Sequence, residues 1–311
     1  MRLDKYLTNK YPNLSRVYIK NQVNLGNFVV YPESSRGIGN KKVKPSYLLR
    51  EGDKVAFAPG FALPDASQIL PNPEIKLNII YEDNNVLVIN KPAGLSVHPR
   101  QDKNGLPLAQ EIGSTLVSGL LAYYPAIASV GDVPSLRPGL VHRLDKDTSG
   151  VMIIAKNQIS FDWLKKQFKE RQTAKKYLAL VHGKLKEKQG EIKTLLARAS
   201  QNPTKQKVSR EGKEAITQYK VIKEFQDYSL IEACPKTGRL HQIRVHLAHL
   251  GHPVAGDAKY GDKRLPTLPG LTRQFLHAKS LEITLPNNQK KTFQAPLPEE
   301  LLAVLAPLEK I

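Results

Sequence analysis

The feature that most limits the fold of this chain is a series of short apolar runs that look like β-strands. Each run is rich in β-branched or large apolar residues and is bounded by turn residues. Helical patterns are few between the runs, and strands and helices do not alternate strictly. We therefore predict an α+β domain around a mostly antiparallel mixed sheet rather than a doubly wound parallel one. The runs lie at residues 85–89, 151–155, 177–181, 215–222, 228–233 and 281–285.

Residues 58–78 separate this region from the start of the chain. They contain four prolines and little periodicity, which is typical of an extended linker. Before them, two short helical patterns, the second with Ser15 as its expected cap, and two strand patterns predict a compact unit. A chain of 311 residues also exceeds the size that one core usually serves. We predict a small α/β-type domain at residues 1–60, a linker at residues 61–78 and a larger domain at residues 79–311.

The charge of the chain indicates the kind of partner it binds. Lysine and arginine total 47 against 28 acidic residues, a net charge of +19, and such an excess is typical of proteins that neutralise phosphates. Residues 1–60 hold 11 basic and four acidic residues. An anionic membrane surface or a gain in solubility would also explain a basic surface, so the motifs have to decide between these interpretations.

The sequence contains no sign of a membrane or of export. No stretch approaches the roughly 20 apolar residues that span a bilayer, and the first residues lack the basic-then-apolar run of a secretory signal. We expect a cytoplasmic protein that contacts no membrane. The single cysteine, Cys234, cannot form an internal disulfide, and core packing is its expected role.

A polar loop at residues 142–150 lies between two of the apolar strand patterns. Its sequence is His-Arg-Leu-Asp-Lys-Asp-Thr-Ser-Gly. Asp147 suits an ordinary turn in which the side chain bonds local amides. Asp145 follows Leu144 beside the apolar stretch, so we expect a partly buried carboxylate that needs a partner. Such a carboxylate can serve as a general base, a metal ligand or a covalent nucleophile.

A second polar cluster, at residues 236–247, joins a strand to a helix that ends at Gly251. Its histidines lack acidic or cysteine partners at metal-binding spacing, so we expect no metal. Arg244 lies between Ile243 and Val245. We therefore expect its stem to be packed and its guanidinium group to need a carboxylate partner, best in a bidentate pair.

A third cluster consists of Lys176 and Tyr177 at the start of a strand pattern. The ring of Tyr177 suits either the core or a platform on which a base stacks. The residues alone favour the core.

Together these clusters resemble the signature of RluA-type RNA pseudouridine synthases. The motifs follow the family's order, and the neighbouring RsuA-type family carries glycine where this chain has His142. The resemblance rests on the loop at 142–150, on Asn-Lys-Pro-Ala-Gly at 90–94, on Lys176 and Tyr177, and on Gly-Arg-Leu-His-Gln-Ile-Arg at 238–244.

The resemblance implies a role for each of several residues. Asp145 is similar to the catalytic aspartate, which either adds to the sugar or removes a sugar proton. Tyr177 is similar to the ring that stacks on the flipped uracil, and Arg244 to the arginine that pairs with the aspartate. Arg143 is similar to the residue that helps to extrude the target nucleotide. The remaining substrate-binding residues it implies are His142, Arg239, His241 and Lys176.

Residues 1–60 resemble the alpha-L RNA-binding domain. The resemblance rests on Arg-Leu-Asp-Lys-Tyr-Leu at 2–7, Leu-Ser-Arg at 14–16, Ile-Lys at 19–20 and Leu-Arg-Glu-Gly-Asp at 49–53. The chain departs from the pattern at residues 31–42, where it has a longer basic loop. Arg16 and Lys20 lie four residues apart and could follow a phosphate backbone, although they also suit a solvated helix face. The RNA contacts we expect are Arg2, Lys5, Arg16, Lys20 and Lys44.

The two resemblances imply an isomerase that converts uridines of structured RNA to pseudouridine without a cofactor or a metal. Large-subunit ribosomal RNA is the expected substrate, because family members that carry the alpha-L domain commonly act there, and tRNA is the alternative. Two rival classes are a non-catalytic RNA-binding or ribosome-assembly factor on the same fold and a metal-dependent nuclease. The first class is disfavoured because Asp145, Tyr177 and Arg244 are all present. The second is disfavoured because it needs a cluster of acidic metal ligands, which the sequence does not show. We expect a monomer whose partner is RNA.

Overall fold

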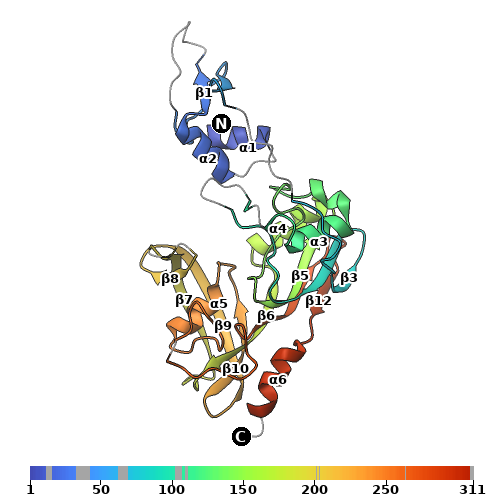
Figure 1. The fold of residues 1–311 in the computed structure, drawn as a ribbon, viewed down its shortest axis with the longest axis vertical. Coiled ribbons are helices and arrows are strands. Elements are labelled where there is room, and N and C mark those ends of the chain that lie inside the picture. Colours follow the sequence, from blue (N-terminus) through green and yellow to red (C-terminus); the bar gives the residue numbers. More distant parts are fainter. Residues whose placement is uncertain are drawn as a thin grey trace. The chain divides into compact units, whose positions relative to one another are not determined.

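A computed structural model of the protein describes residues 1–11, 16–32, 43–61, 69–101, 107–108, 111–200, 202, 204–262 and 264–308. The fold consists of two compact units (Figure 1). The first contains Met1–Lys76 and Val97–Gly139, and the second contains Leu77–Ser96 and Leu140–Ile311. The chain therefore passes from the first unit to the second twice, and the domain boundary at residues 61–78 stays a prediction.

The start of the first unit has its own apolar core. Helices α1 (Leu3–Lys10) and α2 (Arg16–Leu25) accompany strands β1 (Phe28–Tyr31) and β2 (Lys54–Phe57), which pair antiparallel. The two helices and two strands predicted before residue 58 are therefore confirmed. Ser15, the predicted helix cap, and most of the loop at residues 31–42 lie outside the described residues. The core consists of Leu3, Leu7, Ile19, Val23, Phe28, Val30 and Val43.

Three basic side chains of this unit gather around the buried carboxylate of Asp4. Arg2 Nε lies 3.0 Å from Asp4 Oδ1, Arg16 Nη2 lies 2.9 Å from Oδ2, and Lys20 Nζ lies 3.9 Å from Oδ2. Burial opposes ionisation of Asp4, but the hydrogen bonds and charges of Arg16 and Arg2 outweigh burial and hold its pKa below the ordinary value. Each basic side chain remains 43–52% exposed. The same cations can therefore still face an anionic partner.

The remainder of the first unit holds the end of the predicted linker in place. It contains helix α3 (Leu116–Tyr123) and the short 3-10 helix η2 (Pro125–Ser129). The Leu70 N–H donates to the carbonyl of Ile112, and the Asn72 N–H donates to the carbonyl of Ser118. The described end of the predicted linker, residues 69–78, therefore contains a turn at residues 73–75 and is hydrogen-bonded to the residues around α3.

The described residues of the second unit form one ten-stranded sheet with the order β3-β4-β5-β11-β6-β10-β9-β7-β8, and β12 pairs with β11 off this path. Every pairing is antiparallel except that of β5 with β11. The predicted α+β class and mostly antiparallel mixed sheet are therefore confirmed. The strands are β3 (Ile79–Glu82), β4 (Val86–Lys91), β5 (Ser149–Ala155), β6 (Ala174–His182), β7 (Gln189–Arg198), β8 (Gln206–Ser209), β9 (Lys213–Glu224), β10 (Tyr228–Pro235), β11 (Leu276–Thr284) and β12 (Lys290–Gln294).

Three helices accompany this sheet (Figure 1): α4 (Gln158–Lys169), α5 (Gln242–His249) and α6 (Glu299–Leu308). Asn157 caps α4, because its side chain accepts a hydrogen bond from the Ser160 N–H. Ser160 itself lies in the first turn of the helix. Within the ranges that the structure covers, none of the helices has the length and apolar character needed to cross a bilayer.

The parallel pairing of β5 with β11 depends on Gly150. Its φ of +119° is rare for residues with a side chain, and a Cβ atom at this position would lie 2.2 Å from the carbonyl oxygen of Ala278 in β11. Glycine therefore allows the two strands to pair where the polar loop at 142–150 ends. The pairing fixes the position of that loop, and of Asp145 in it, relative to the rest of the sheet.

Candidate active site

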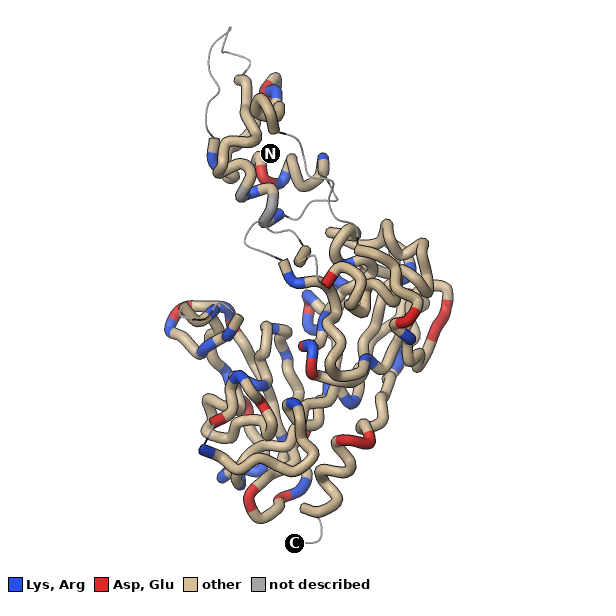
Figure 2. Tube along the Cα trace, viewed as in Figure 1, with Lys and Arg blue, Asp and Glu red and all other residues tan. Residues whose placement is uncertain are grey.

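A pocket of about 630 Å³ opens in the second unit where the loop at 142–150 meets the segment between β10 and α5. Its volume lies within the range of ligand pockets in proteins. Among the described residues, Asp145 is the one acidic residue that lines it, and Figure 2 marks the basic residues of this unit in blue. The basic residues of the lining are Arg143, Lys165, Lys169, Arg171, Lys175, Lys236, Arg239 and Arg244.

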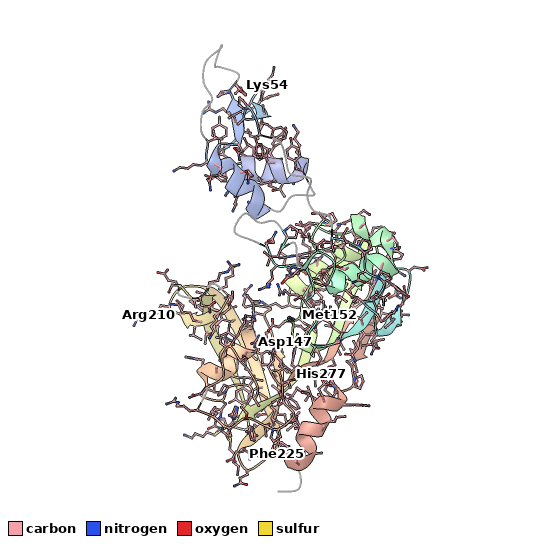
Figure 3. All side chains as sticks on the ribbon, viewed as in Figure 1. Lys54, Asp147, Met152, Arg210, Phe225 and His277 are labelled. Carbon is pink, nitrogen blue, oxygen red and sulfur yellow. The ribbon has the colours of Figure 1, made fainter. Side chains whose placement is uncertain are left out.

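A buried amino group anchors the loop that carries Asp145. Lys91, at the end of β4, is fully buried, and its Nζ donates to the carbonyls of Pro92 (2.6 Å), Leu95 (2.9 Å) and Lys146 (3.0 Å). Burial lowers the pKa of Lys91 to about 7, although the charge of Asp147 opposes this shift. Asp147 itself lies just before β5, whose Met152 is buried (Figure 3).

Arg244 joins Asp145 to a second carboxylate. Its Nη1 donates to Asp145 Oδ2 at 2.9 Å, while its Nε and Nη2 form a bidentate pair with Asp257 at 2.7 and 2.8 Å. Burial opposes the charges, but these bonds outweigh it, so the pKa of Arg244 is raised and that of Asp257 is lowered. Asp257 is further bound by the N–H groups of Lys259 and Tyr260. The arrangement holds the Asp145 carboxylate in a fixed position in the pocket.

His241 lies close to the carboxylate of Asp145, and Tyr260 contacts both His241 and Arg244. His241 Nε2 lies 3.9 Å from Asp145 Oδ1, and His241 Nδ1 lies 2.7 Å from the hydroxyl of Tyr260. The guanidinium of Arg244 lies 5.2 Å from the centre of the Tyr260 ring. Burial lowers the pKa of His241 to about 4, against the opposing charge of Asp145. The imidazole is therefore neutral at physiological pH.

Tyr177, in β6, reaches both the core and the pocket. It packs against the buried cluster that includes Ala179, Val181 and Ile243, and it also lines the pocket that contains Asp145. Burial, and then the charge of Asp145, raise the pKa of Tyr177 above its ordinary value. The phenol is therefore protonated at neutral pH, and the ring belongs to the core while it also lines the pocket.

Of the other substrate-binding residues expected from the sequence, Arg143, His142 and Arg239 also line the pocket. The ring of His142 stacks on Phe168 with centroids 4.6 Å apart, and its Nε2 accepts a hydrogen bond from the Ile153 N–H. Burial, and then the charge of Lys175, lower its pKa to about 3. His142 is thus a neutral wall residue, and Arg239 is anchored by a bond from its Nε to the carbonyl of Glu214.

Lys176 was expected to bind the substrate, but it lies outside the pocket. Its Nζ pairs with Glu232 at 3.1 Å, and Lys176 is not among the residues that line the pocket. Side chains alternate between the faces of a strand, so Lys175 and Tyr177 share the face that Lys176 does not. Lys175 therefore takes the expected position, and burial, followed by the charge of Lys236, lowers its pKa to about 8.

Asp257 and Tyr260 were missed by sequence reasoning. The expected need of Arg244 for a bidentate carboxylate was met by Asp257, 13 residues further along the chain. The sequence feature that could have indicated Asp257 is the glycine directly before it, Gly256. In the structure Gly256 has a φ of +73°, and a Cβ atom at its position would lie 2.2 Å from the carbonyl oxygen of Arg273. A glycine required at this point marks a turn of fixed shape, and the carboxylate that follows it is a natural capping group.

The composition of the pocket limits the chemistry it can carry. Among the residues that the structure describes, no three His, Cys, Asp or Glu side chains are grouped so that they could hold a metal ion. The pocket offers one carboxylate, a protonated phenol, two neutral imidazoles and a ring of cations. This combination suits a covalent or proton-transfer step on a ligand that carries phosphate groups.

The chain is similar to known RNA pseudouridine synthases in sequence and in fold. The model of the RNA pseudouridylate synthase family matches residues 85–249, a range that contains Asp145, Tyr177 and Arg244. An uncharacterised RNA pseudouridine synthase of Bacillus subtilis is 36% identical over 99% of this chain and 94% of its own length.

Two further relatives extend this similarity. The ribosomal large subunit pseudouridine synthase D of Blochmanniella floridana is 36% identical over 99% of this chain and 95% of its own length. Among solved structures, human RNA pseudouridylate synthase domain containing 4 is similar with a TM-score of 0.55 and 28% identity, over 75% of this chain and 93% of that one.

Proposed function

This chain belongs to the RNA pseudouridylate synthase family, and from that premise we propose that it isomerises uridines of large-subunit ribosomal RNA through Asp145, without a cofactor. The observation that carries the proposal is the carboxylate of Asp145. It is the one acid in a pocket lined by cations, it is held by Arg244 at 2.9 Å, and Tyr177 lines the same pocket.

The reaction explains why these groups suffice. The bond between N1 of uracil and C1′ of the ribose breaks, the base turns in place, and C5 bonds to C1′. One proton leaves C5 and one is gained at N1, so substrate and product contain the same atoms and no cosubstrate is consumed. Asp145 acts on the sugar, either by adding to C1′ or by removing a sugar proton. Arg244 holds the carboxylate in place through its bond to Oδ2.

The target uridine has to leave its stack before Asp145 can reach it. Extruding a base costs a few kcal/mol, and stacking on an aromatic ring returns roughly 1–3 kcal/mol. Tyr177 supplies the ring, and Arg143, which lines the same pocket, occupies the vacated space. The cations of the pocket lining contact the phosphates on either side of the extruded nucleotide.

The choice of ribosomal RNA is supported by the relatives. The protein of Blochmanniella floridana, and one of Borreliella burgdorferi that is 35% identical over 98% of this chain, are both named ribosomal large subunit pseudouridine synthase D. The test is to map pseudouridines in total RNA from cells with and without this gene. We expect one or a few uridines of large-subunit ribosomal RNA to lose the modification. A loss confined to tRNA would contradict the substrate, and no loss anywhere would contradict the function.

The cofactor-free reaction is tested with purified protein on the RNA so identified. The RNA is folded first, and the assay then contains excess chelator and no added nucleotide. We expect turnover to be unchanged. A loss of turnover that a divalent ion restores, with the RNA fold verified separately, would count against the proposal.

The start of the chain is proposed to supply affinity for RNA. The cations around Asp4 are Arg2, Arg16 and Lys20, and Lys5 and Lys44 are exposed in the same unit. Because the core of this part runs from Leu3 to Val43 and partly buried Phe61 packs against it, we propose that residues 1–60 form a separate RNA-binding module.

Removing residues 1–62 is expected to weaken RNA binding while leaving the chemical step intact. Each lost phosphate contact should flatten the dependence of log K on log salt by roughly one unit. The Michaelis constant should therefore rise and kcat should change little, because Asp145, Tyr177 and Arg244 all lie beyond the deletion. The measurement is steady-state kinetics on a long RNA across a salt series.

A matched control removes charge without removing the module. Lys5→Gln with Lys44→Gln changes two exposed side chains and should flatten the salt dependence by roughly two units if both contact phosphates. Full affinity and an unchanged slope in the truncated protein would show that the module does not bind this RNA. A folded truncated protein that has lost its maximal rate would show that residues 1–62 help to assemble the active site.

A further inference from the structure

The hydroxyl of Tyr260 links three parts of the second unit. It accepts a hydrogen bond from the Gln206 N–H at the start of β8 (2.8 Å), and it lies 2.7 Å from His241 Nδ1. The ring of the same tyrosine lies beneath the guanidinium of Arg244. Tyr260 therefore contacts His241 and Arg244, and each of these two residues lies within 4 Å of the Asp145 carboxylate.

The bond from the Gln206 N–H favours one placement of the hydrogens on Tyr260 and His241. A phenol has one hydrogen, and the Tyr260 oxygen already accepts from the Gln206 N–H. Its own hydrogen is therefore best placed on the line to His241 Nδ1, which then acts as the acceptor. A neutral imidazole carries one N–H, and burial keeps His241 neutral at physiological pH. The N–H is accordingly at Nε2, the nitrogen that faces Asp145 Oδ1.

The backbone of His241 is also unusual. Its φ is 55° and its ψ is 19°, a left-handed conformation that residues other than glycine, asparagine and aspartate rarely adopt. Such a conformation persists only where the surroundings hold it, and it is found often at functional sites. Here it places the imidazole between Tyr260 and Asp145, directly before α5.

We infer that Tyr260 and His241 are positioning residues, in which Tyr260 fixes the tautomer of His241 and the His241 Nε2–H orients Oδ1 of Asp145, while Arg244 holds Oδ2. The inference rests on the proposed function, since it assigns a support to the aspartate of that reaction. The separation of 3.9 Å between Nε2 and Oδ1 is about 1 Å longer than a hydrogen bond. Catalytic hydrogen bonds often tighten when substrate binds.

The test compares two amides at position 241. Counted from Cβ, the amide of glutamine reaches the position of Nε2, whereas the amide of asparagine reaches only that of Nδ1. His241→Gln can therefore still donate to Asp145, and His241→Asn can only contact Tyr260. We expect kcat to fall by less than roughly fivefold in His241→Gln and by roughly 10- to 100-fold in His241→Asn, with KM little changed in both.

If His241 had a purely structural role, the activities of the two variants would follow the opposite order. Asparagine tolerates the left-handed conformation better than glutamine does, so His241→Asn should be at least as stable as His241→Gln in thermal unfolding. An asparagine variant that is as active as the glutamine variant, or more active, overturns the inference. A well-folded but slow asparagine variant supports it.

Tyr260 is tested by removing its hydroxyl alone. Tyr260→Phe keeps the ring beneath Arg244 but releases His241 Nδ1, and we expect kcat to fall by roughly 10-fold. Because Tyr260 is inferred to act through His241, the same change should cause no further loss in a His241→Gln background. An equal loss in both backgrounds contradicts the proposed order of action.

The tautomer can be read without turnover. In ¹⁵N spectra of the full chain, we expect His241 to be protonated at Nε2 in the wild type and to become a mixture of tautomers in Tyr260→Phe. Protonation at Nδ1 in the wild type overturns the inference, and this measurement also decides the matter if His241→Gln does not fold. A wild-type chain that forms no pseudouridine overturns the proposed function and this inference together. An active wild type with the wrong tautomer overturns the inference alone.

Discussion

Asp145→Asn is expected to reduce pseudouridine formation by roughly 10³-fold or more, as the loss of a group that reacts in the transition state does. Asparagine has the shape of aspartate and keeps an oxygen that can accept the bond from Arg244 Nη1. What it loses is the negative charge, and with it the ability to add to the sugar or to take a sugar proton. Arg244 remains paired with Asp257, so the chain should fold normally.

The measurement is single-turnover kinetics together with RNA affinity. We expect affinity to change little, because the proposed phosphate contacts come from the cations that line the pocket and not from Asp145. Asp147→Asn is the matched control. It lies two residues along the same loop and is not among the residues that line the pocket, so its turnover should stay near that of the wild type. Retained turnover in Asp145→Asn would contradict the assignment of the reacting carboxylate.

Asp257→Ala is expected to destabilise the second unit by roughly 3–5 kcal/mol, the usual cost of leaving a buried charge without its partner. The Asp257 side chain is fully buried and Arg244 is nearly so. Without Asp257, the guanidinium of Arg244 loses two of its three bonds to carboxylates. Activity should fall as well, because Arg244 then no longer holds Asp145 in one position.

The comparison variant for this prediction is Asp262→Ala. Asp262 also pairs closely with an arginine, Arg264, but the Arg264 side chain is 89% exposed. Surface ion pairs contribute little to stability, so Asp262→Ala should leave the urea midpoint and the activity unchanged. Equal effects of the two substitutions would show that burial of the Asp257–Arg244 pair is not what matters.

The stability lost in Asp257→Ala should also depend on pH. The pKa of Asp257 is lower in the folded chain than its ordinary value, which is about 3.9 in an unfolded chain. The contribution of Asp257 is therefore fully present above that value and is lost as the pH falls through the folded pKa. Urea titrations of the wild type and Asp257→Ala at neutral and at acid pH would measure the convergence of the two proteins.

The parts of this protein that could be predicted from sequence are those whose signal is local. The strand patterns at 85–89, 151–155 and 228–233 are confirmed as β4, β5 and β10, because each is a short apolar run between turn residues. The α+β class followed from their order along the chain. The need of Arg244 for a bidentate carboxylate also followed from its two apolar neighbours.

The parts that could not be predicted depend on contacts between distant residues. The sequence did not show which face of β6 meets the pocket, because Lys175 and Lys176 have the same side chain. Only the pairing of β6 with β10 and β11 sets the directions of the two side chains. The identity of the carboxylate beside Arg244 was also hidden. Asp257 lies in a turn beyond α5, and only the folded chain brings its side chain back to Arg244.

The place of β11 in the sheet has a consequence for when this enzyme can become active during its synthesis. Asp145 precedes β5 and Tyr177 lies in β6, and the sheet joins these two strands only through β11, which lies between them. Contacts between residues so far apart in the chain form late. We therefore expect a nascent chain that ends before residue 276 to carry both residues without a common site. The enzyme can then begin to modify RNA only after β11 has been synthesised and has joined the sheet.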